Sequence, residues 1–164
     1  MAKSRAATTS STENTAGGAA PADAIAPTRS IAQNPGIRYE ILRRNSQNQF
    51  IATRIDTRFE EGDEIVIAVN KNAGGIVSVL QKQGSGWQAL PLASQTLFDA
   101  RTAPVKLARG TLDLVVVLSS QQAAAAPPSQ TRNQVSETLG NAVYVVTPGQ
   151  PEGPVAAQLR ITVH

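Results

Sequence analysis

Apolar and polar side chains alternate with a period of two along several stretches after Pro35. Residues 37–42 (IRYEIL) and 64–69 (EIVIAV) each place an apolar side chain at every second position. Because successive side chains of a strand point to opposite faces, this spacing predicts strands with one buried face. The run from Thr111 to Ser119 is apolar at most positions and rich in valine. It predicts a central strand buried on both faces and argues against a helix.

Other β-branched runs, separated by turn residues, predict further strands. They cover residues 50–56, 76–80, 87–92, 142–147 and 156–163, with a brief pairing segment at 105–107. The pattern amounts to about seven or eight strands, and few connections are long enough for a crossover helix. The predicted fold class is therefore all-β, and the simplest architecture is an antiparallel β-sandwich.

The connections between these runs differ in length and composition. Residues 70–75 are expected to close a hairpin between the runs on either side. Residues 94–104 show no regular pattern and are interpreted as irregular. Residues 120–140 form a long break with four alanines and two prolines, and a loop of that length in a compact domain is functional or disordered. A short helix at 134–139 is an option within it.

The N-terminal segment differs in composition from the rest of the chain. Residues 1–35 are rich in Ala, Ser, Thr, Gly and Pro and contain no aromatic residue. Such a segment cannot bury enough apolar surface to offset the entropy of ordering it. It is predicted to be a disordered tail or linker ahead of a β-sandwich domain at 36–164. A transit peptide is the alternative, but two acidic residues and the prolines count against it, and no apolar run follows the first basic residues as in a secretory signal.

Composition and charge narrow the function classes. The 164 residues include no cysteine and carry a net charge of +3. Without cysteine there is no disulfide framework, no thiolate metal site and no thiol nucleophile. The basic residues are spread along the chain instead of gathering on one arm, so nucleic-acid binding is not expected. No apolar run approaches the roughly 20 residues of a membrane helix, so no membrane insertion by this chain is expected.

One family resemblance spans residues 37–164. The chain carries a phenylalanine followed by Gly-Asp, an alternating strand, a turn ending in glycine, a Val-rich strand, a glycine turn and a Leu-Pro pair. The matching residues are Phe59, Gly62, Asp63, Ile65, Ile67, Val69, Asn70, Gly75, Val77, Val79, Gly86, Leu90 and Pro91. In this pattern the chain resembles the bacterial domain-of-unknown-function family numbered forty-three eighty-four. The resemblance implies an immunoglobulin-like sandwich that serves as an accessory module of membrane-tethered, regulatory or peptidase-like bacterial proteins. It also implies a location in the cell envelope or periplasm, and it implies no known activity.

An acidic turn is the first candidate site. Glu60, Glu61, Asp63 and Glu64 place four carboxylates in five positions, and carboxylate oxygens are ligands that calcium prefers. The spacing matches no calcium-loop rule, so a solvated turn leading into a strand is the competing interpretation. The single histidine, His164, is the last residue and has no second histidine or cysteine with which to form a zinc site.

The segment Trp87–Pro91 is the second candidate. Trp87, Leu90 and Pro91 are predicted to form a binding surface, because tryptophan is enriched among the residues that dominate interface energies. The competing and preferred interpretation of Trp87 is a core position between the two sheets, since the chain has few other aromatic residues to fill that space.

The sequence favours binding over catalysis. It contains no phosphate-binding glycine loop and no serine elbow, so no enzyme activity and no cofactor are expected. The predicted function is a non-catalytic binding or structural accessory module with a protein partner. The loop at 120–140 is an expected contact surface, together with Trp87–Pro91. One alternative is a calcium-dependent binding domain or enzyme that uses Glu60–Glu64. A second is a filament or surface-layer subunit whose head donates a strand to a neighbour.

Overall fold

The structure is a computed structural model that describes residues 34–120, 134–148 and 154–164. All of them belong to one of the two units into which the chain divides, Gln33–His164. The predicted tail, apart from its last two residues, lies outside the described residues, as does most of the predicted contact loop at 120–140.

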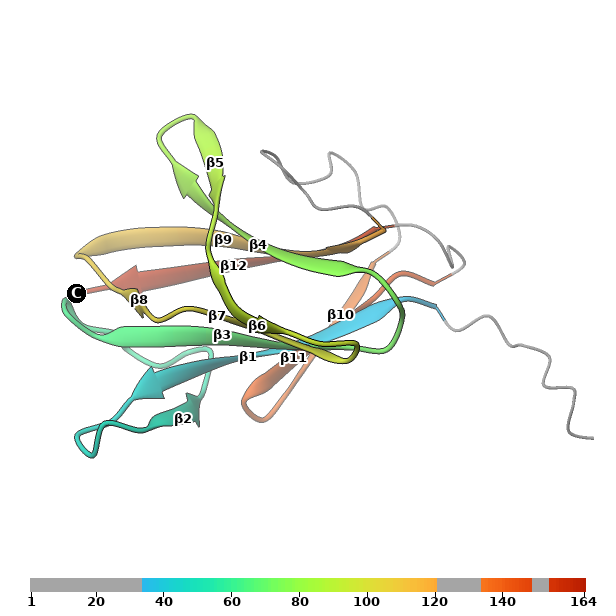
Figure 1. The fold of residues 1–164 in the computed structure, drawn as a ribbon. Coiled ribbons are helices and arrows are strands. Elements are labelled where there is room, and N and C mark those ends of the chain that lie inside the picture. Colours follow the sequence, from blue (N-terminus) through green and yellow to red (C-terminus); the bar gives the residue numbers. More distant parts are fainter. Residues whose placement is uncertain (1–33, 121–133, 149–153) are drawn as a thin grey trace, which may run out of the picture. The chain divides into compact units, whose positions relative to one another are not determined.

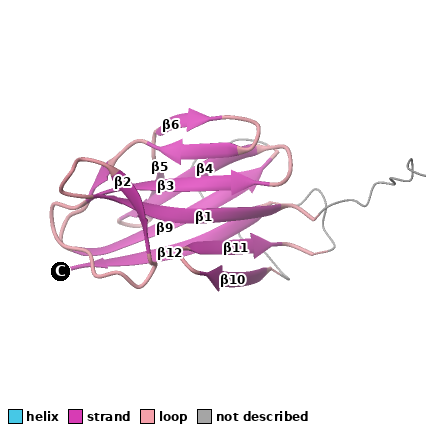
Figure 2. Ribbon diagram, turned by 90° about the horizontal axis from the view of Figure 1, so that it is seen from below, coloured by secondary structure: helices cyan, strands magenta, loops and turns pink. Residues whose placement is uncertain are grey.

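The described residues form two antiparallel β-sheets packed as a sandwich, without a helix (Figures 1 and 2). Within the described residues there is accordingly no helix that could cross a membrane. The predicted fold class is confirmed, with more strands than expected. The twelve strands of the described part are β1 (Gly36–Arg44), β2 (Phe50–Thr53), β3 (Glu64–Lys71), β4 (Ile76–Gln83), β5 (Gly86–Ala89), β6 (Leu92–Gln95), β7 (Asp99–Thr102), β8 (Val105–Lys106), β9 (Gly110–Ser119), β10 (Val135–Leu139), β11 (Ala142–Val146) and β12 (Val155–Val163).

The strand order is that of an immunoglobulin-like domain with one insertion. The eight-stranded sheet runs β10-β11-β1-β3-β7-β6, with β2 paired to β1 and β8 paired to β3, and the four-stranded sheet runs β12-β9-β4-β5. The orders β1-β3-β7-β6 and β12-β9-β4 correspond to the two sheets of the immunoglobulin fold. The hairpin β10–β11 is the insertion. In the sequence this hairpin lies between β9 and β12, which are neighbours in the four-stranded sheet. In the structure β11 pairs with β1, so the hairpin extends the eight-stranded sheet.

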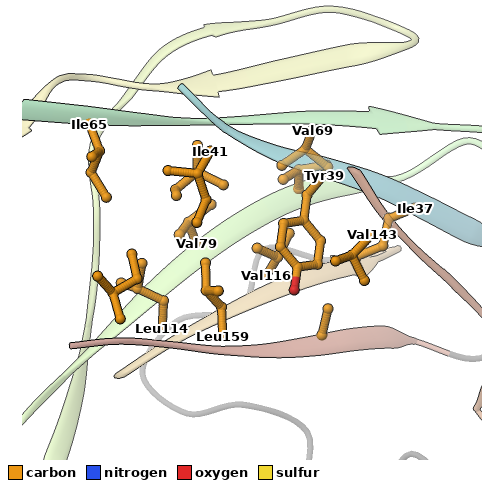
Figure 3. Close-up of a cluster of buried hydrophobic side chains, with 14 of the residues drawn as sticks. Ile37, Tyr39, Ile41, Ile65, Val69, Val79, Leu114, Val116, Val143 and Leu159 are labelled. Carbon is orange, nitrogen blue, oxygen red and sulfur yellow. The ribbon is translucent and has the colours of Figure 1, made fainter. Parts of the chain in front are cut away.

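The core lies between the sheets and is filled by the alternating side chains that the sequence pattern indicated (Figure 3). On β1, Ile37, Tyr39 and Ile41 are buried and face the four-stranded sheet. The central strand β9 is buried on both faces, as predicted, because Leu114 and Val116 enter this core while the intervening Val115 packs into a smaller cluster on the other side.

Burial gives Tyr39 a testable pH dependence. Desolvation raises the pKa of Tyr39 above its usual 10.0, because the interior disfavours the phenolate. The unfolded chain ionises at the usual pKa, so the stability that Tyr39 contributes is fully present below pH 10.0 and is lost as the pH rises through the folded-state pKa. Denaturant titrations should show that Tyr39→Phe loses less stability than wild type on this alkaline side. An equal loss in Tyr39→Phe and wild type would contradict the prediction.

The predicted hairpin over residues 70–75 is wrong. β3 and β4 lie in different sheets, where β3 pairs with β1, β7 and β8, and β4 pairs with β5 and β9. The apolar faces that carry Ile65 and Ile67 on β3 and Val77 and Val79 on β4 both enter the main core, so the strands meet across the core instead of sharing a hydrogen-bonded edge. The connection ends at Gly75, where φ is +133° and a Cβ atom would lie 2.8 Å from the backbone oxygen of Ser119.

Three other expected elements differ in the structure. Residues 94–104 are not irregular, because β6 and β7 form a hairpin there. The helix considered at 134–139 is strand β10, whose five residues all pair with β11. The predicted strand over 50–56 ends at Thr53, where the backbone turns and Thr57 N–H donates to the Arg54 carbonyl at 3.1 Å.

The strand predicted over 87–92 is also divided. β5 ends at Ala89, the Leu90 N–H still donates to the Val79 carbonyl at 2.8 Å, and the chain then crosses to the other sheet as β6. Pro91 occupies the crossing, where its missing N–H costs no ladder hydrogen bond.

Candidate functional site

The structure separates the three predicted binding residues. Trp87 lies opposite Lys82 on the outer face of the four-stranded sheet, where it is partly buried against the smaller apolar cluster. The preferred interpretation, a Trp87 between the sheets, is therefore wrong. Leu90 is partly buried against the main core, and Pro91 is exposed where the chain changes sheets. Trp87 and Leu90 face different sides of the sheet, so the three residues do not form one surface.

The acidic turn is organised by arginine. The Asp63 carboxylate lies 2.9 Å from the Arg43 guanidinium and also accepts the Glu60 N–H at 2.9 Å. Glu64 pairs with Arg44 at 2.8 Å. In the part of the chain that the structure describes, no group of three or more His, Asp or Glu side chains is placed to hold a metal ion. His164 follows β12, and its N–H donates to the Phe59 carbonyl at 3.0 Å.

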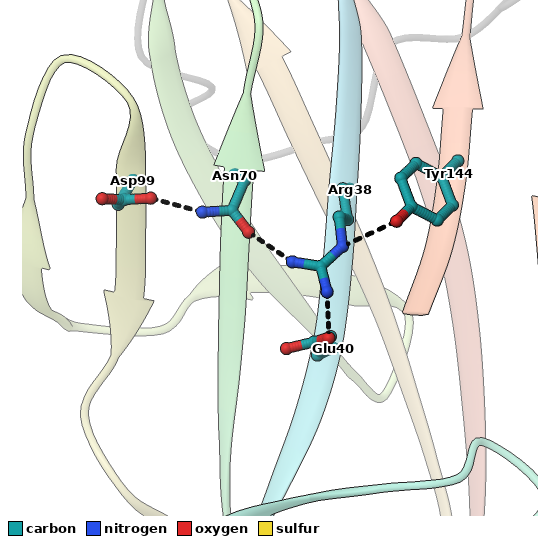
Figure 4. Close-up of polar contacts among 5 residues, drawn as sticks. All are labelled: Arg38, Glu40, Asn70, Asp99 and Tyr144. Carbon is teal, nitrogen blue, oxygen red and sulfur yellow. Dashed lines mark hydrogen bonds and ion pairs between the residues drawn. The ribbon is translucent and has the colours of Figure 1, made fainter. Parts of the chain in front are cut away.

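A row of polar side chains crosses the outer face of the eight-stranded sheet (Figure 4). The strand register places Arg38 of β1 opposite Asn70 of β3 on one side and Tyr144 of β11 on the other. The row continues to Asp99 of β7 and to Glu137 of β10. Five strands thus contribute one side chain each at the same level of the sheet.

Arg38 is the centre of this row. Its Nε donates to the Tyr144 hydroxyl at 3.0 Å, and its Nη1 donates to Asn70 Oδ1 at 2.9 Å. Its remaining terminal nitrogen forms an ion pair with Glu40, and Asn70 in turn donates to Asp99. The guanidinium carbon lies 5.7 Å from the centre of the Tyr144 ring, within cation–π range. These contacts hold the arginine and the tyrosine in fixed positions on a rigid sheet.

Exposed apolar side chains lie beside the Arg38–Tyr144 pair. Val135 and Leu139 of β10 are 59% and 56% exposed, and the register puts both on the same face as Tyr144, which is 37% exposed. Arg38 and Tyr144 also border a shallow hollow of about 240 Å³ whose lining includes Gly36 and Val146. We call Arg38, Val135, Glu137, Leu139 and Tyr144 the β10 patch.

Among the described strands, β10 presents an unprotected edge. All five of its residues are exposed, it contains no proline, glycine or lysine, and no described strand pairs with its second edge. Three other edges are blunted in ways that natural sheets commonly use. β6 has an irregular register at Ala93, β5 is four residues long and precedes Pro91, and the side chain of Gln134 bonds both backbone groups of Ala156 on β12.

The β10 patch was missed by sequence reasoning. Arg38 and Tyr144 are 106 positions apart and meet only through the β1–β11 register. The one sequence signal for the patch is the spacing of Val135 and Leu139, which lie two positions before and after Glu137. That spacing fits an exposed strand face as well as a helix turn.

No protein-family model, curated protein or solved structure matches this chain. The family resemblance therefore stays a prediction that depends on the residues quoted for it.

Proposed function

We propose that this chain is a non-catalytic protein-binding module of a bacterial cell-envelope protein, and that its partner adds an extended segment to the free edge of β10. The observation that supports this proposal is the β10 patch, in which an unprotected strand edge adjoins exposed apolar side chains and a fixed arginine–tyrosine pair. The bacterial envelope setting comes from the family resemblance alone.

The free edge of β10 has the unpaired backbone groups that strand addition requires. A sheet edge presents a row of backbone N–H and C=O groups, which an extended peptide pairs with by main-chain hydrogen bonds. Specificity then comes from the alternate side chains of the peptide that reach the sheet face. On β10 those contacts are Val135, Glu137 and Leu139, so the matching segment carries apolar side chains at alternate positions with a lysine or arginine between them.

Tyr144 and Arg38 lie on the second and third strands from the added segment, so they become anchors of the interface where the partner also covers the sheet face beside β10. Arginine and tyrosine are enriched among residues whose truncation costs most binding energy. Here they are already held by hydrogen bonds to each other and to Asn70, so little side-chain freedom remains to be lost on binding.

A second copy of the chain fits this edge less well than a different protein. If two β10 strands paired antiparallel about their central residue, Glu137 would lie opposite Glu137, and like charges directly opposite each other are destabilising. The full chain should therefore be a monomer by light scattering. A dimer that is abolished by substitutions on β10 would assign the edge to self-association and contradict the proposal.

Peptide selection tests the site without a known partner. A displayed library of random linear peptides, selected on the full chain, should yield peptides with the alternating pattern described above. A double variant, V135E/L139E, should weaken their binding by about tenfold or more, because it replaces both exposed apolar contacts by charges that repel an apolar partner.

The matched control is Leu97→Glu, which places the same charge on an apolar residue that is 66% exposed and lies outside the β10 patch. It should bind the selected peptides as wild type does. Peptides that bind V135E/L139E as tightly as the control would show that the site lies elsewhere.

A further inference from the structure

A groove crosses the outer face of the four-stranded sheet, on the opposite side of the sandwich from the β10 patch. Its volume is about 510 Å³, within the range of ligand sites. Figure 1 shows the β4–β5 hairpin bending away from the eight-stranded sheet, so that it flanks this face. The side chains that line the groove from the outward positions of β4, β5, β9 and β12 are Lys82, Trp87, Asp113, Val115, Gln158 and Arg160.

Trp87 gives the groove an aromatic wall. It is the only tryptophan in the chain, and it packs against a buried cluster that includes Leu80, Val115 and Val117. The cluster fixes one side of the indole, and the rest of the ring lines the groove. An indole that is fixed in this way offers a flat apolar surface at little entropic cost.

The polar side chains of the groove carry two positive charges and one negative charge. Arg160 Nε lies 2.6 Å from Asp113 Oδ1, and a second guanidinium nitrogen lies 3.3 Å from Oδ2. The hydrogen bond from Arg160 lowers the pKa of Asp113, with a smaller contribution from Lys82, so Asp113 is ionised at neutral pH. The Arg160 side chain is nevertheless 71% exposed and keeps donors free for a ligand.

We propose that this groove binds an oligosaccharide chain that carries carboxylate groups. The apolar face of a pyranose ring would lie against Trp87. The sugar hydroxyls, which both donate and accept hydrogen bonds, match the mixed donors and acceptors of Asp113, Gln158 and Arg160. The excess positive charge of Lys82 and Arg160 favours an acidic sugar over a neutral one.

A polypeptide ligand suits the groove less well. Its floor is the side-chain face of a sheet, and the strands beneath it, β4, β9 and β12, already pair with one another. An extended peptide would therefore find no free main-chain edge along the floor, and Val115 is the one aliphatic side chain that lines it from an outward position. This site is independent of the proposed protein-binding function, because none of its lining residues belongs to the β10 patch.

The only tryptophan makes the test direct, because intrinsic fluorescence reports on Trp87 alone. Titration of the full chain with oligogalacturonate should change the emission saturably, and neutral cello-oligosaccharides of equal length should bind about tenfold or more weakly. Lys82→Gln and Arg160→Gln should each weaken oligogalacturonate binding by about tenfold. Both positions are exposed, so thermal melts should confirm that each variant folds.

Lys106→Gln, which removes an exposed positive charge from the eight-stranded sheet, is the matched control and should bind as wild type does. Three outcomes would overturn the proposal. They are no saturable change with any saccharide, an equal loss of affinity in Lys106→Gln, and tighter binding of polyglutamate than of oligogalacturonate, which would assign the groove to an acidic polypeptide.

Discussion

Replacement of Phe59 by alanine should lower the free energy of unfolding by about 3–5 kcal/mol. Phe59 is 1% exposed and is among the largest fully buried side chains of the described residues. Its backbone forms a parallel bridge with Val163 at the end of β12, so the ring packs where the two sheets close at one end. Alanine would remove most of the ring and leave a cavity that β-strands on both sides can only partly fill.

Urea titrations of the Phe59→Ala variant measure this loss. Phe98→Ala is the matched control, because Phe98 is 65% exposed and should change stability by less than about 0.5 kcal/mol. A loss below about 1 kcal/mol at position 59 would mean that the ring is not enclosed by the two sheets.

Gly75→Ala should be the most destabilising substitution among the described glycines, because position 75 combines two penalties. Its φ of +133° is a conformation that side chains rarely adopt, and the added Cβ would lie 2.8 Å from the backbone oxygen of Ser119. The strained backbone alone costs about 1–3 kcal/mol. The clash adds to this, because the neighbouring atom is main chain of the central strand β9 and cannot rotate away.

Substitutions at two other glycines measure the cost of the strained backbone separately from the cost of the close contact. Gly110 also has a positive φ, +122°, but a Cβ there would meet nothing within 4 Å, so Gly110→Ala measures the backbone term alone. Gly74 has neither a positive φ nor a neighbour within 4 Å, so Gly74→Ala should be neutral or slightly stabilising. The expected order of stability loss is Gly75, then Gly110, then Gly74. Equal losses at 74 and 75 would contradict the close contact with β9.

Period-two alternation predicted the strands but not their partners. It located β1, β3 and β9 because each has apolar residues on at least one face, which the sequence displays directly. Burial of a face does not say whether the next strand lies beside it or across the core. For this reason residues 70–75 read as a hairpin, although they carry the chain from one sheet to the other. β10 has no buried side chain, and its two apolar residues, Val135 and Leu139, fit a helix turn as well as an exposed strand.

The candidate sites depended on features that no local pattern contains. The sequence alone favours a core position for Trp87, because a sandwich usually buries its few large aromatic residues. The four-stranded sheet, however, is apolar on its outer face as well, at Val115 and Val117, and Trp87 packs there. The polar row of Figure 4 required the register of β1 with two neighbours that lie far from it in the sequence.

Amide hydrogen exchange on β10 tests the central proposal most directly. In the free chain, the β10 amides that do not bond to β11 should exchange rapidly, because no described strand covers that edge. Addition of a peptide selected on the full chain should protect these amides, since strand addition pairs them with the peptide backbone. Unchanged exchange on β10, with protection appearing instead on another part of the sandwich, would contradict the account.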